Sequence, residues 1–167
     1  MPKQRWDLGR WTERLNWWQL SALFGTIVLA DRGTKLLAIK YLQHQFYVLT
    51  PCLNLELAYN HGVSWGMFST NGLGTRCFLS GLIFALFGWL SWHTYYRARR
   101  GRPVWGELLV LAGALGNLWD RCLYGAVVDF IALHWGAWYF PIFNLADIAI
   151  FNGVLVMLYY TLMEPIS

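Results

Sequence analysis

The sequence predicts an all-α membrane protein with four transmembrane helices and a small extracytoplasmic β element between the first and second helices. Three observations favour this fold class. Of the 167 residues, 57% are hydrophobic and only 13% are charged, whereas charged residues make up about 25% of a typical soluble domain. Four segments approach the roughly 20 apolar residues needed to cross a bilayer. Two clusters of basic residues would also lie on one membrane face if these segments alternate in direction.

The four expected spans are residues 17–39, 77–96, 104–121 and 140–163, preceded by an N-terminal tail of residues 1–16. The second span carries no Asp, Glu, Lys or Arg, whereas the first is apolar up to Ala30 and then becomes charged. Pro141 suits the first turn of a helix, so the fourth helix is expected to begin there. No repeat or linker divides the chain, so we expect one integral membrane domain over residues 1–167.

Basic residues predict the orientation of these spans. Short loops rich in Lys and Arg remain in the cytoplasm, and residues 41–75 and 122–139 contain neither. We therefore expect both termini in the cytoplasm and these two loops outside. The basic residues are Lys3, Arg5, Arg10 and Arg14 in the tail, and Arg97, Arg99, Arg100 and Arg102 between the second and third spans.

The first outer loop contains a strand pattern. Apolar residues alternate with others through residues 53–60, which is the period of a half-buried strand. We expect this strand to lie at the membrane surface with its leucines toward lipid or the helix ends. Residues 127–131 in the second outer loop are a candidate for a further short strand. Cys52 and Cys122 would share the outer side, where a disulfide is possible but not required.

Small residues recur at four-residue spacing within three spans, where they would let helices approach closely in lipid. We interpret them as packing residues. The pairs are Gly81 and Ala85, Ala112 and Gly116, and Ala149 and Gly153.

Polar side chains concentrate where the first, third and fourth spans reach the outer face. Asp31 and Lys35 would share a helix face at i, i+4 spacing. Opposite charges near the membrane can neutralise one another, so structural salt bridges are favoured over catalysis for Asp31, Lys35, Asp120 and Arg121. The other members are Asn117, Asn144 and Asp147 in the spans, and Asn60 and Asp129 in the outer loops.

Asp129 and Asp147 differ from these charged residues, because neither has a basic residue within four positions. Burial and a neighbouring carboxylate both raise a carboxyl pKa, so a pair sharing one proton is expected. Such a pair can provide the acid and the base of a peptidase, but a proton or ion pathway fits these residues about equally well. His61 and His134 could join the carboxylates at a metal, yet no HExxH or comparable spacing supports one. We expect no metal and no cofactor.

Five segments, in order along the chain, resemble the motifs of the lipoprotein signal peptidase family, the signal peptidase II of bacteria. They extend over most of the sequence, and their joint occurrence is highly specific. They are Asp31-Arg32-Gly33-Thr34-Lys35, Tyr59-Asn60-His61-Gly62-Val63-Ser64-Trp65-Gly66, Gly113-Ala114-Leu115-Gly116-Asn117-Leu118-Trp119-Asp120-Arg121, Val127-Val128-Asp129-Phe130 and Phe143-Asn144-Leu145-Ala146-Asp147.

The resemblance implies an aspartyl endopeptidase of the bacterial inner membrane with its active site on the outer face. It would remove the signal peptide from diacylglyceryl-modified prolipoproteins, just before the lipidated cysteine. Its partners would be these lipidated signal peptides and membrane lipid, with no nucleic acid, and it would act as a monomer. Val63-Ser64-Trp65 departs from the family's Ala-Ala-Phe and adds bulk near the presumed substrate groove. Asp129 and Asp147 match the catalytic dyad, and positions associated with dyad support or substrate binding are matched by Asp31, Lys35, Asn60, Gly62, Asn117, Asp120, Arg121 and Asn144.

Two other classes of function remain open from the residues. A proton-coupled small membrane carrier would use the aspartates as a relay, and its ionisable groups should extend toward the middle of the bilayer. A non-catalytic assembly factor would use the polar residues only to lock the helices together. The crowding of polar residues at one face favours a reaction at the membrane surface over a relay.

Overall fold

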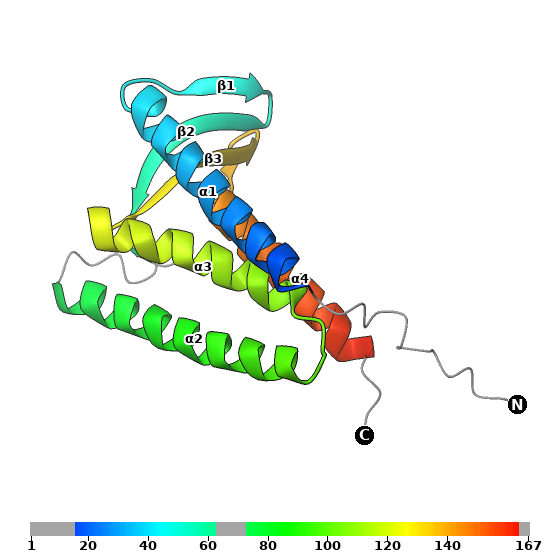
Figure 1. Cartoon of the computed structure of the whole chain (residues 1–167). Helices are drawn as coiled ribbons and strands as arrows, with labels where there is room; N and C mark the ends of the chain where they lie inside the picture. Colours follow the sequence, from blue (N-terminus) through cyan, green and yellow to red (C-terminus); the bar gives the residue numbers. More distant parts are fainter. Residues whose placement is uncertain (1–15, 63–72, 164–167) are drawn as a thin grey trace, which may run out of the picture.

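The structure is a computed structural model that describes residues 16–62 and 73–163. In this part of the chain, four helices accompany a small antiparallel sheet, as the sequence predicts (Figure 1). Residues 63–65, where the family pattern is broken, lie outside the described residues. The elements in chain order are α1 (Trp17–Leu42), β1 (Tyr47–Thr50), β2 (Leu53–Asn60), α2 (Leu73–Arg99), α3 (Trp105–Tyr124), β3 (Val127–Trp135), β4 (Trp138–Tyr139) and α4 (Leu145–Met163).

The fourth helix begins at Leu145, so the prediction of a start near residue 140 with Pro141 in the first turn is wrong. The backbone of Phe143 is already engaged with β3, since its carbonyl accepts from the N–H groups of Phe130 and Ile131 at 3.0 and 2.8 Å. A helix reaching back through residue 143 would break these bonds. The first helix, by contrast, begins as expected, after the Asn16 side chain accepts from the N–H of Trp18.

The sheet has the order β1-β2-β3-β4, and β3 is longer than the short strand expected from residues 127–131. The pairing of β2 with β3 places Ala58 opposite Asp129, which brings the two outer loops together. Leu55 and Leu57 pack against Ala38 and Leu42 of α1. The prediction that the leucine face of this strand meets a helix end is confirmed.

Close packing of α3 against α4 depends on glycine. A Cβ on Gly153 would lie 2.6 Å from the carbonyl oxygen of Gly106, and a Cβ on Gly113 would lie 2.8 Å from the Ile150 side chain. Any larger residue at these positions would push the two helices apart. Gly81 has open space around it, so the prediction of packing at Gly81 and Ala85 is wrong. In Figure 1, α3 lies between α2 and α4.

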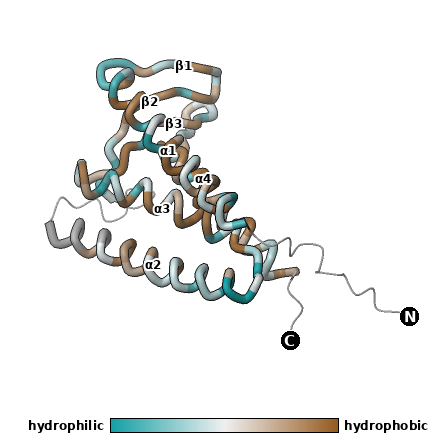
Figure 2. The backbone as a smooth tube through the Cα atoms, in the orientation of Figure 1, coloured by the Kyte–Doolittle hydropathy of each residue, from teal (hydrophilic) through white to brown (hydrophobic). Residues whose placement is uncertain are grey.

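Hydrophobic residues run along much of α3 and α4 (Figure 2), and many large apolar side chains of the helices are exposed. Leu158 and Leu162 of α4 are examples, with 52% and 73% of their surface exposed. Among the described helices, α4 is the one that is both long and apolar enough to cross a membrane by length and composition. The four-span arrangement therefore stays a prediction. Cys52 and Cys122 are free and exposed.

Candidate active site

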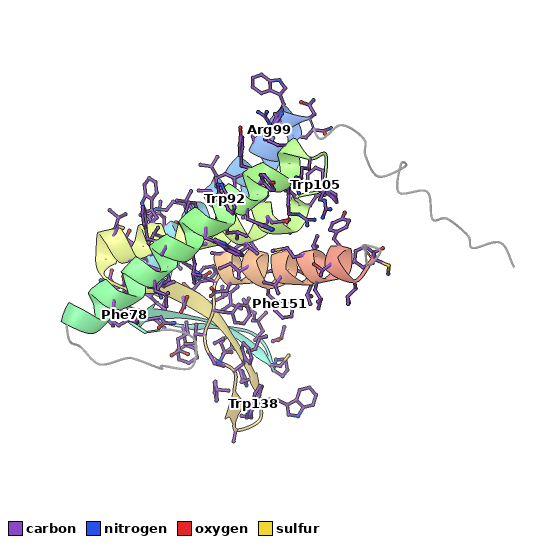
Figure 3. The ribbon with its side chains drawn as sticks, turned by 90° about the horizontal axis from the view of Figure 1, so that it is seen from below. Phe78, Trp92, Arg99, Trp105, Trp138 and Phe151 are labelled. Carbon is purple, nitrogen blue, oxygen red and sulfur yellow. The ribbon has the colours of Figure 1, made fainter. Side chains whose placement is uncertain are left out.

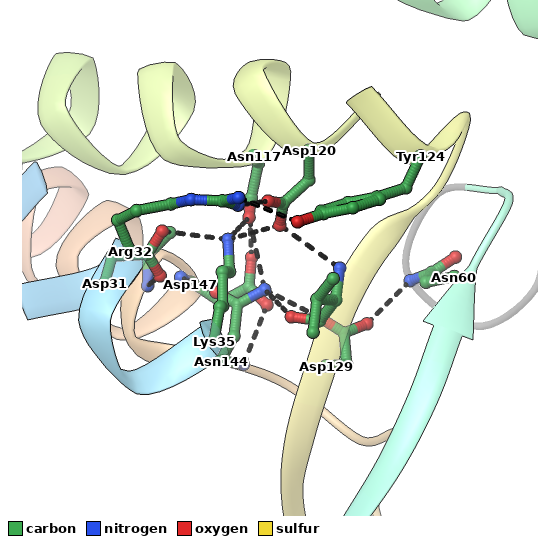
Figure 4. A network of polar contacts seen from close by, with 12 residues as sticks. Asp31, Arg32, Lys35, Asn60, Asn117, Asp120, Tyr124, Asp129, Asn144 and Asp147 are labelled. Carbon is green, nitrogen blue, oxygen red and sulfur yellow. Dashed lines mark hydrogen bonds and ion pairs between the residues drawn. The ribbon is translucent and has the colours of Figure 1, made fainter. Parts of the chain in front are cut away.

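Polar side chains from α1, α3, α4, β2 and β3 meet at the C-terminal end of α3 (Figure 4). Lys35 is at the centre of one half of this site. Its Nζ lies 2.9 Å from Asp31 Oδ2 and 2.8 Å from Asp120 Oδ2, and it donates to Asn117 Oδ1 at 2.9 Å. The Lys35 side chain is fully buried. The predicted i, i+4 ion pair between Asp31 and Lys35 is therefore present.

Asp120 pairs differently from what the sequence suggests. Its ion pairs are with residues of α1 and not with its neighbour Arg121. Oδ1 lies 3.0 Å from Arg32 Nη1, and Oδ2 accepts from the N–H of Val128 at 3.2 Å as well as pairing with Lys35. Arg121 donates to the carbonyl of Gly62 at 2.8 Å and so holds the end of β2 against α3. Both oxygens of Asp120 are thereby compensated.

Arg32 and Tyr124 belong to the site but were not among the predicted site residues. Arg32 Nη2 donates to the Tyr124 hydroxyl at 2.7 Å, and its guanidinium carbon lies 5.4 Å from the centre of the Tyr124 ring. Arg32 lies next to Asp31 in the first motif, which is the only sequence signal that pointed to it. Tyr124 is the last residue of α3 and lies outside all five motifs.

Asp31 and Asn144 together satisfy the first turn of α4. Asp31 Oδ1 accepts from the N–H of Ala146 at 2.9 Å. Asn144 Oδ1 accepts from the N–H of Asp147 at 2.9 Å, while Asp147 Oδ2 accepts from the N–H of Asn144 at 3.2 Å. This reciprocal pattern is a capping box. Because Asp147 is its acidic member, the helix start fixes the position of this carboxylate, and Gly116 leaves room for Asp31, which a Cβ there would strike.

The same Asn144 side chain links the two aspartates. Its Nδ2 donates to Asp129 Oδ1 at 2.6 Å and also lies 3.1 Å from Asn117 Oδ1. Asn117 Nδ2 in turn donates to Asp147 Oδ1 at 2.8 Å. The carboxylates of Asp129 and Asp147, from two elements of the fold, are therefore linked through the side-chain amides of Asn144 and Asn117.

Asp129 is 2% exposed, and burial, followed by repulsion from Asp147, raises its pKa from 3.8 to about 7. The hydrogen bonds from Asn60 Nδ2, at 3.2 Å to Oδ2, and from Asn144 act in the opposite direction and lower this pKa. Asn60 Oδ1 meanwhile accepts from the N–H of Gly62 at 3.0 Å. Asp129 therefore carries a proton for much of the time near neutral pH.

The two candidate histidines have other contacts. His61 Nδ1 lies 3.3 Å from the carbonyl oxygen of Gly125, and His134 stacks on Tyr139 with ring centres 5.0 Å apart.

The arrangement of Asp129 and Asp147 suits acid–base chemistry. A partly protonated carboxyl beside a second carboxylate is the arrangement that general acid–base hydrolysis of a carbonyl bond uses.

Comparison with known proteins assigns the chain to a family. Residues 23–163 match the family model described as signal peptidase (SPase) II. The chain belongs to the signal peptidase II family. A lipoprotein signal peptidase of Dichelobacter nodosus is 35% identical over 147 residues, which cover 86% of this chain and 96% of the relative. That of Burkholderia mallei (strain SAVP1) is 38% identical over 149 residues, which cover 80% of this chain and 81% of the relative.

Solved structures of bacterial membrane enzymes share the fold of this chain. A structure described as a bacterial membrane enzyme is 26% identical, with a TM-score of 0.70, and the match covers 88% of this chain and 94% of that one. A second of the same description, 24% identical with a TM-score of 0.71, shows the same fold over 89% of this chain and 94% of that one. The family and these neighbours identify a bacterial membrane protein, and the resemblance seen in the motifs is confirmed.

Proposed function

We propose that this signal peptidase II removes the signal peptide from lipid-modified prolipoproteins, cutting just before the lipidated cysteine, with Asp129 and Asp147 as its catalytic pair. The observation that carries the catalytic assignment is the pair of side-chain amides of Asn144 and Asn117, which links the Asp129 carboxylate to the Asp147 carboxylate through consecutive hydrogen bonds. The raised pKa of Asp129 adds to it, because a peptidase of this kind needs one protonated carboxyl beside an ionised one.

The two aspartates differ in burial, because Asp129 is buried whereas Asp147 is partly exposed, and this difference favours a separate role for each. Asp147 accepts from Asn117 Nδ2 and from the N–H of Asn144, which suits an ionised carboxylate that removes a proton from water. As the water oxygen bonds to the scissile carbonyl carbon, protonated Asp129 donates to the carbonyl oxygen. A proton then passes to the leaving nitrogen, the C–N bond breaks, and the products are a free carboxyl on the signal peptide and an amine on the cysteine. The shared proton belongs to the pair as a whole.

The surrounding residues support the pair in two ways. Asp31, Lys35 and Asp120 form a buried ion cluster that holds α1 against α3 and against the first turn of α4. Asn117 and Asn144 orient the carboxylates directly. Asn60 contacts Asp129, while Gly62 and Arg121 join the end of β2 to α3 beside it, where an extended substrate would pass.

We infer a membrane arrangement from the different character of the two ends of α3. This helix of 20 residues is about 30 Å long, and the carboxylates lie at its C-terminal end, far from the basic turn before Trp105. We propose one integral domain over residues 1–167 with four spans, both termini in the cytoplasm and the site facing outward, acting as a monomer. A lipidated cysteine in the outer leaflet would then present its scissile bond at headgroup depth. The charged site residues of α1 and α3 all lie at this end; they are Asp31, Arg32, Lys35, Asp120 and Arg121. This clustering disfavours a carrier that relays protons across the bilayer.

An apolar cavity of about 330 Å³ beside the site offers a surface for the lipid group. Leu37, Ala38, Leu55 and Phe130 line it, and Phe130 follows Asp129 in the chain. Replacing Leu55 with Glu should weaken cleavage of the lipidated precursor, because a charge there opposes an acyl chain. Wild-type turnover in this variant would remove the cavity from the proposal.

The proposed function is tested with purified protein and a precursor peptide, with and without the diacylglyceryl group. Wild-type protein should cleave only the modified peptide, immediately before the cysteine. Asp129→Asn and Asp147→Asn should fold normally and lose cleavage by several orders of magnitude. Substantial activity in either variant would refute the catalytic pair, and equal cleavage of the unmodified peptide would refute the substrate class.

A further inference from the structure

A basic patch covers the turn between α2 and α3, at the end of the molecule opposite to the carboxylates. We define it as Arg99, Arg100 and Arg102, which are all exposed, together with Tyr95 and Tyr96. Figure 3 shows Arg99 close to Trp92 and Trp105 at this end. The patch lies roughly 20 Å or more along α3 from the aspartates, so it takes no part in the site described above.

Basic residues outnumber acidic residues in the segment 97–107 that contains this turn. Glu107 is the acidic residue of the segment 97–107, and its Oε1 lies 2.9 Å from Arg97 Nε. Glu107 is 3% exposed, so it is not available to other groups at the surface. Four arginines against one glutamate leave the segment with an excess of three positive charges.

Aromatic rings hold two of these arginines in place. The Arg100 guanidinium carbon lies 4.1 Å from the centre of the Tyr96 ring, and Tyr96 stacks on Trp92 with ring centres 5.9 Å apart and planes at 16°. Arg99 lies 5.8 Å from the centre of the Tyr95 ring and donates to the Tyr95 hydroxyl at 3.3 Å. A guanidinium stacked by its face still presents N–H donors at its edge, in the fork that matches phosphate oxygens.

We propose that this patch binds the headgroup of an anionic phospholipid, with Arg99 and Arg100 donating to the phosphate. The ligand should be a lipid, because the stack continues away from the arginines into Trp92, which is 62% exposed on the apolar surface of α2. Indole and phenol rings favour the boundary between headgroups and hydrocarbon. Basic residues next to a span attract anionic lipids through charge alone. In this patch, lipid binding should depend also on the aromatic rings, because the rings hold the arginines in position. This inference rests on the proposed membrane arrangement but not on the proposed peptidase mechanism.

The test uses purified full-length protein in detergent, titrated with phosphatidylglycerol or phosphatidylcholine of identical acyl chains, with bound lipid counted by native mass spectrometry. Tyr96→Leu and Arg100→Lys both keep the net charge but remove the stack. Each should weaken phosphatidylglycerol binding about threefold or more, given the usual strength of such a contact. Tyr159→Leu is the matched control and should bind as the wild type does, because Tyr159 is exposed on α4 and packs against Tyr160 instead of an arginine.

Three results would overturn the proposal. Equal binding of both lipids by the wild type would remove the preference for anionic headgroups. Binding of phosphatidylglycerol by both Tyr96→Leu and Arg100→Lys as tightly as by the wild type would leave charge alone as the cause. Displacement of the lipid by glycerol 3-phosphate at a similar concentration would make the ligand a soluble anion. Circular dichroism of each variant verifies that the helices are intact.

Discussion

Replacing Asp129 with Asn should flatten the pH dependence of thermal stability between pH 5 and pH 8. Burial and the charge of Asp147 raise the pKa of Asp129 from 3.8 to about 7 in the folded protein. Between these values the folded state binds more protons than the unfolded state, so stability falls as pH rises. The contribution of Asp129 is fully present below pH 4 and is lost as pH passes through about 7.

The size of this effect follows from the shift. Each pKa unit corresponds to about 1.4 kcal/mol, and integration from pH 5 to pH 8 gives a loss of about 2–3 kcal/mol in the free energy of unfolding. For a chain of this size the loss corresponds to a fall in Tm of roughly 5–10 °C. The absolute Tm of Asp129→Asn is a poor measure of this pH effect. The amide nitrogen of the new asparagine would face the donor of Asn60 or of Asn144, which costs about 1–3 kcal/mol at any pH.

The assay is thermal unfolding in detergent at four pH values, for the wild type and for Asp129→Asn. Groups that the two proteins share contribute to both curves, so their effect cancels in the difference between them. Asp147→Asn is the control: it removes the repulsion that is the second cause of the shift, so the fall in stability should persist but move to lower pH. If Asp129→Asn keeps the wild-type fall, Asp129 is not the group that titrates and the reasoning fails.

Three further outcomes are expected from the same site. Cleavage by the wild type should decline above about pH 7, as Asp129 loses the proton it donates; a pH–rate profile that stays flat to pH 9 would contradict this. Asn144→Ser keeps an oxygen that can accept from the N–H of Asp147 but loses the amide that lowers the pKa of Asp129. Its pH–rate profile should therefore decline at higher pH than that of the wild type. Asn144→Ala also loses the capping oxygen, so it should lose about 1 kcal/mol of stability in addition. Asp120→Asn should lower the free energy of unfolding by about 3–5 kcal/mol, because it removes a negative charge that pairs with Arg32 and with the buried Lys35. A normally stable but inactive variant would show that Asp120 acts in the chemistry instead.

Local patterns in the chain were sufficient to predict the helices. Apolar runs and basic clusters are short-range features, so they located all four helices to within a few residues, apart from the start of α4. That start depends on a partner far away in sequence, because β3 takes the backbone of Phe143 and Asn144 then caps the helix. The length of β3 could not be predicted for the same reason: β2 and α1 decide how far its backbone is paired and covered.

The sequence by itself determined which residue types are available for chemistry, since Asp129 and Asp147 have apolar neighbours and no basic residue within four positions along the chain. Only the tertiary structure decided how they are held. Asp120 takes Arg32 and Lys35 of α1 as its partners in place of the adjacent Arg121, and Asn144 contacts both aspartates at once. The physical reason is that electrostatic and hydrogen-bonding partners are chosen by distance in space and by burial, and neither quantity exists until the helices and the sheet have packed.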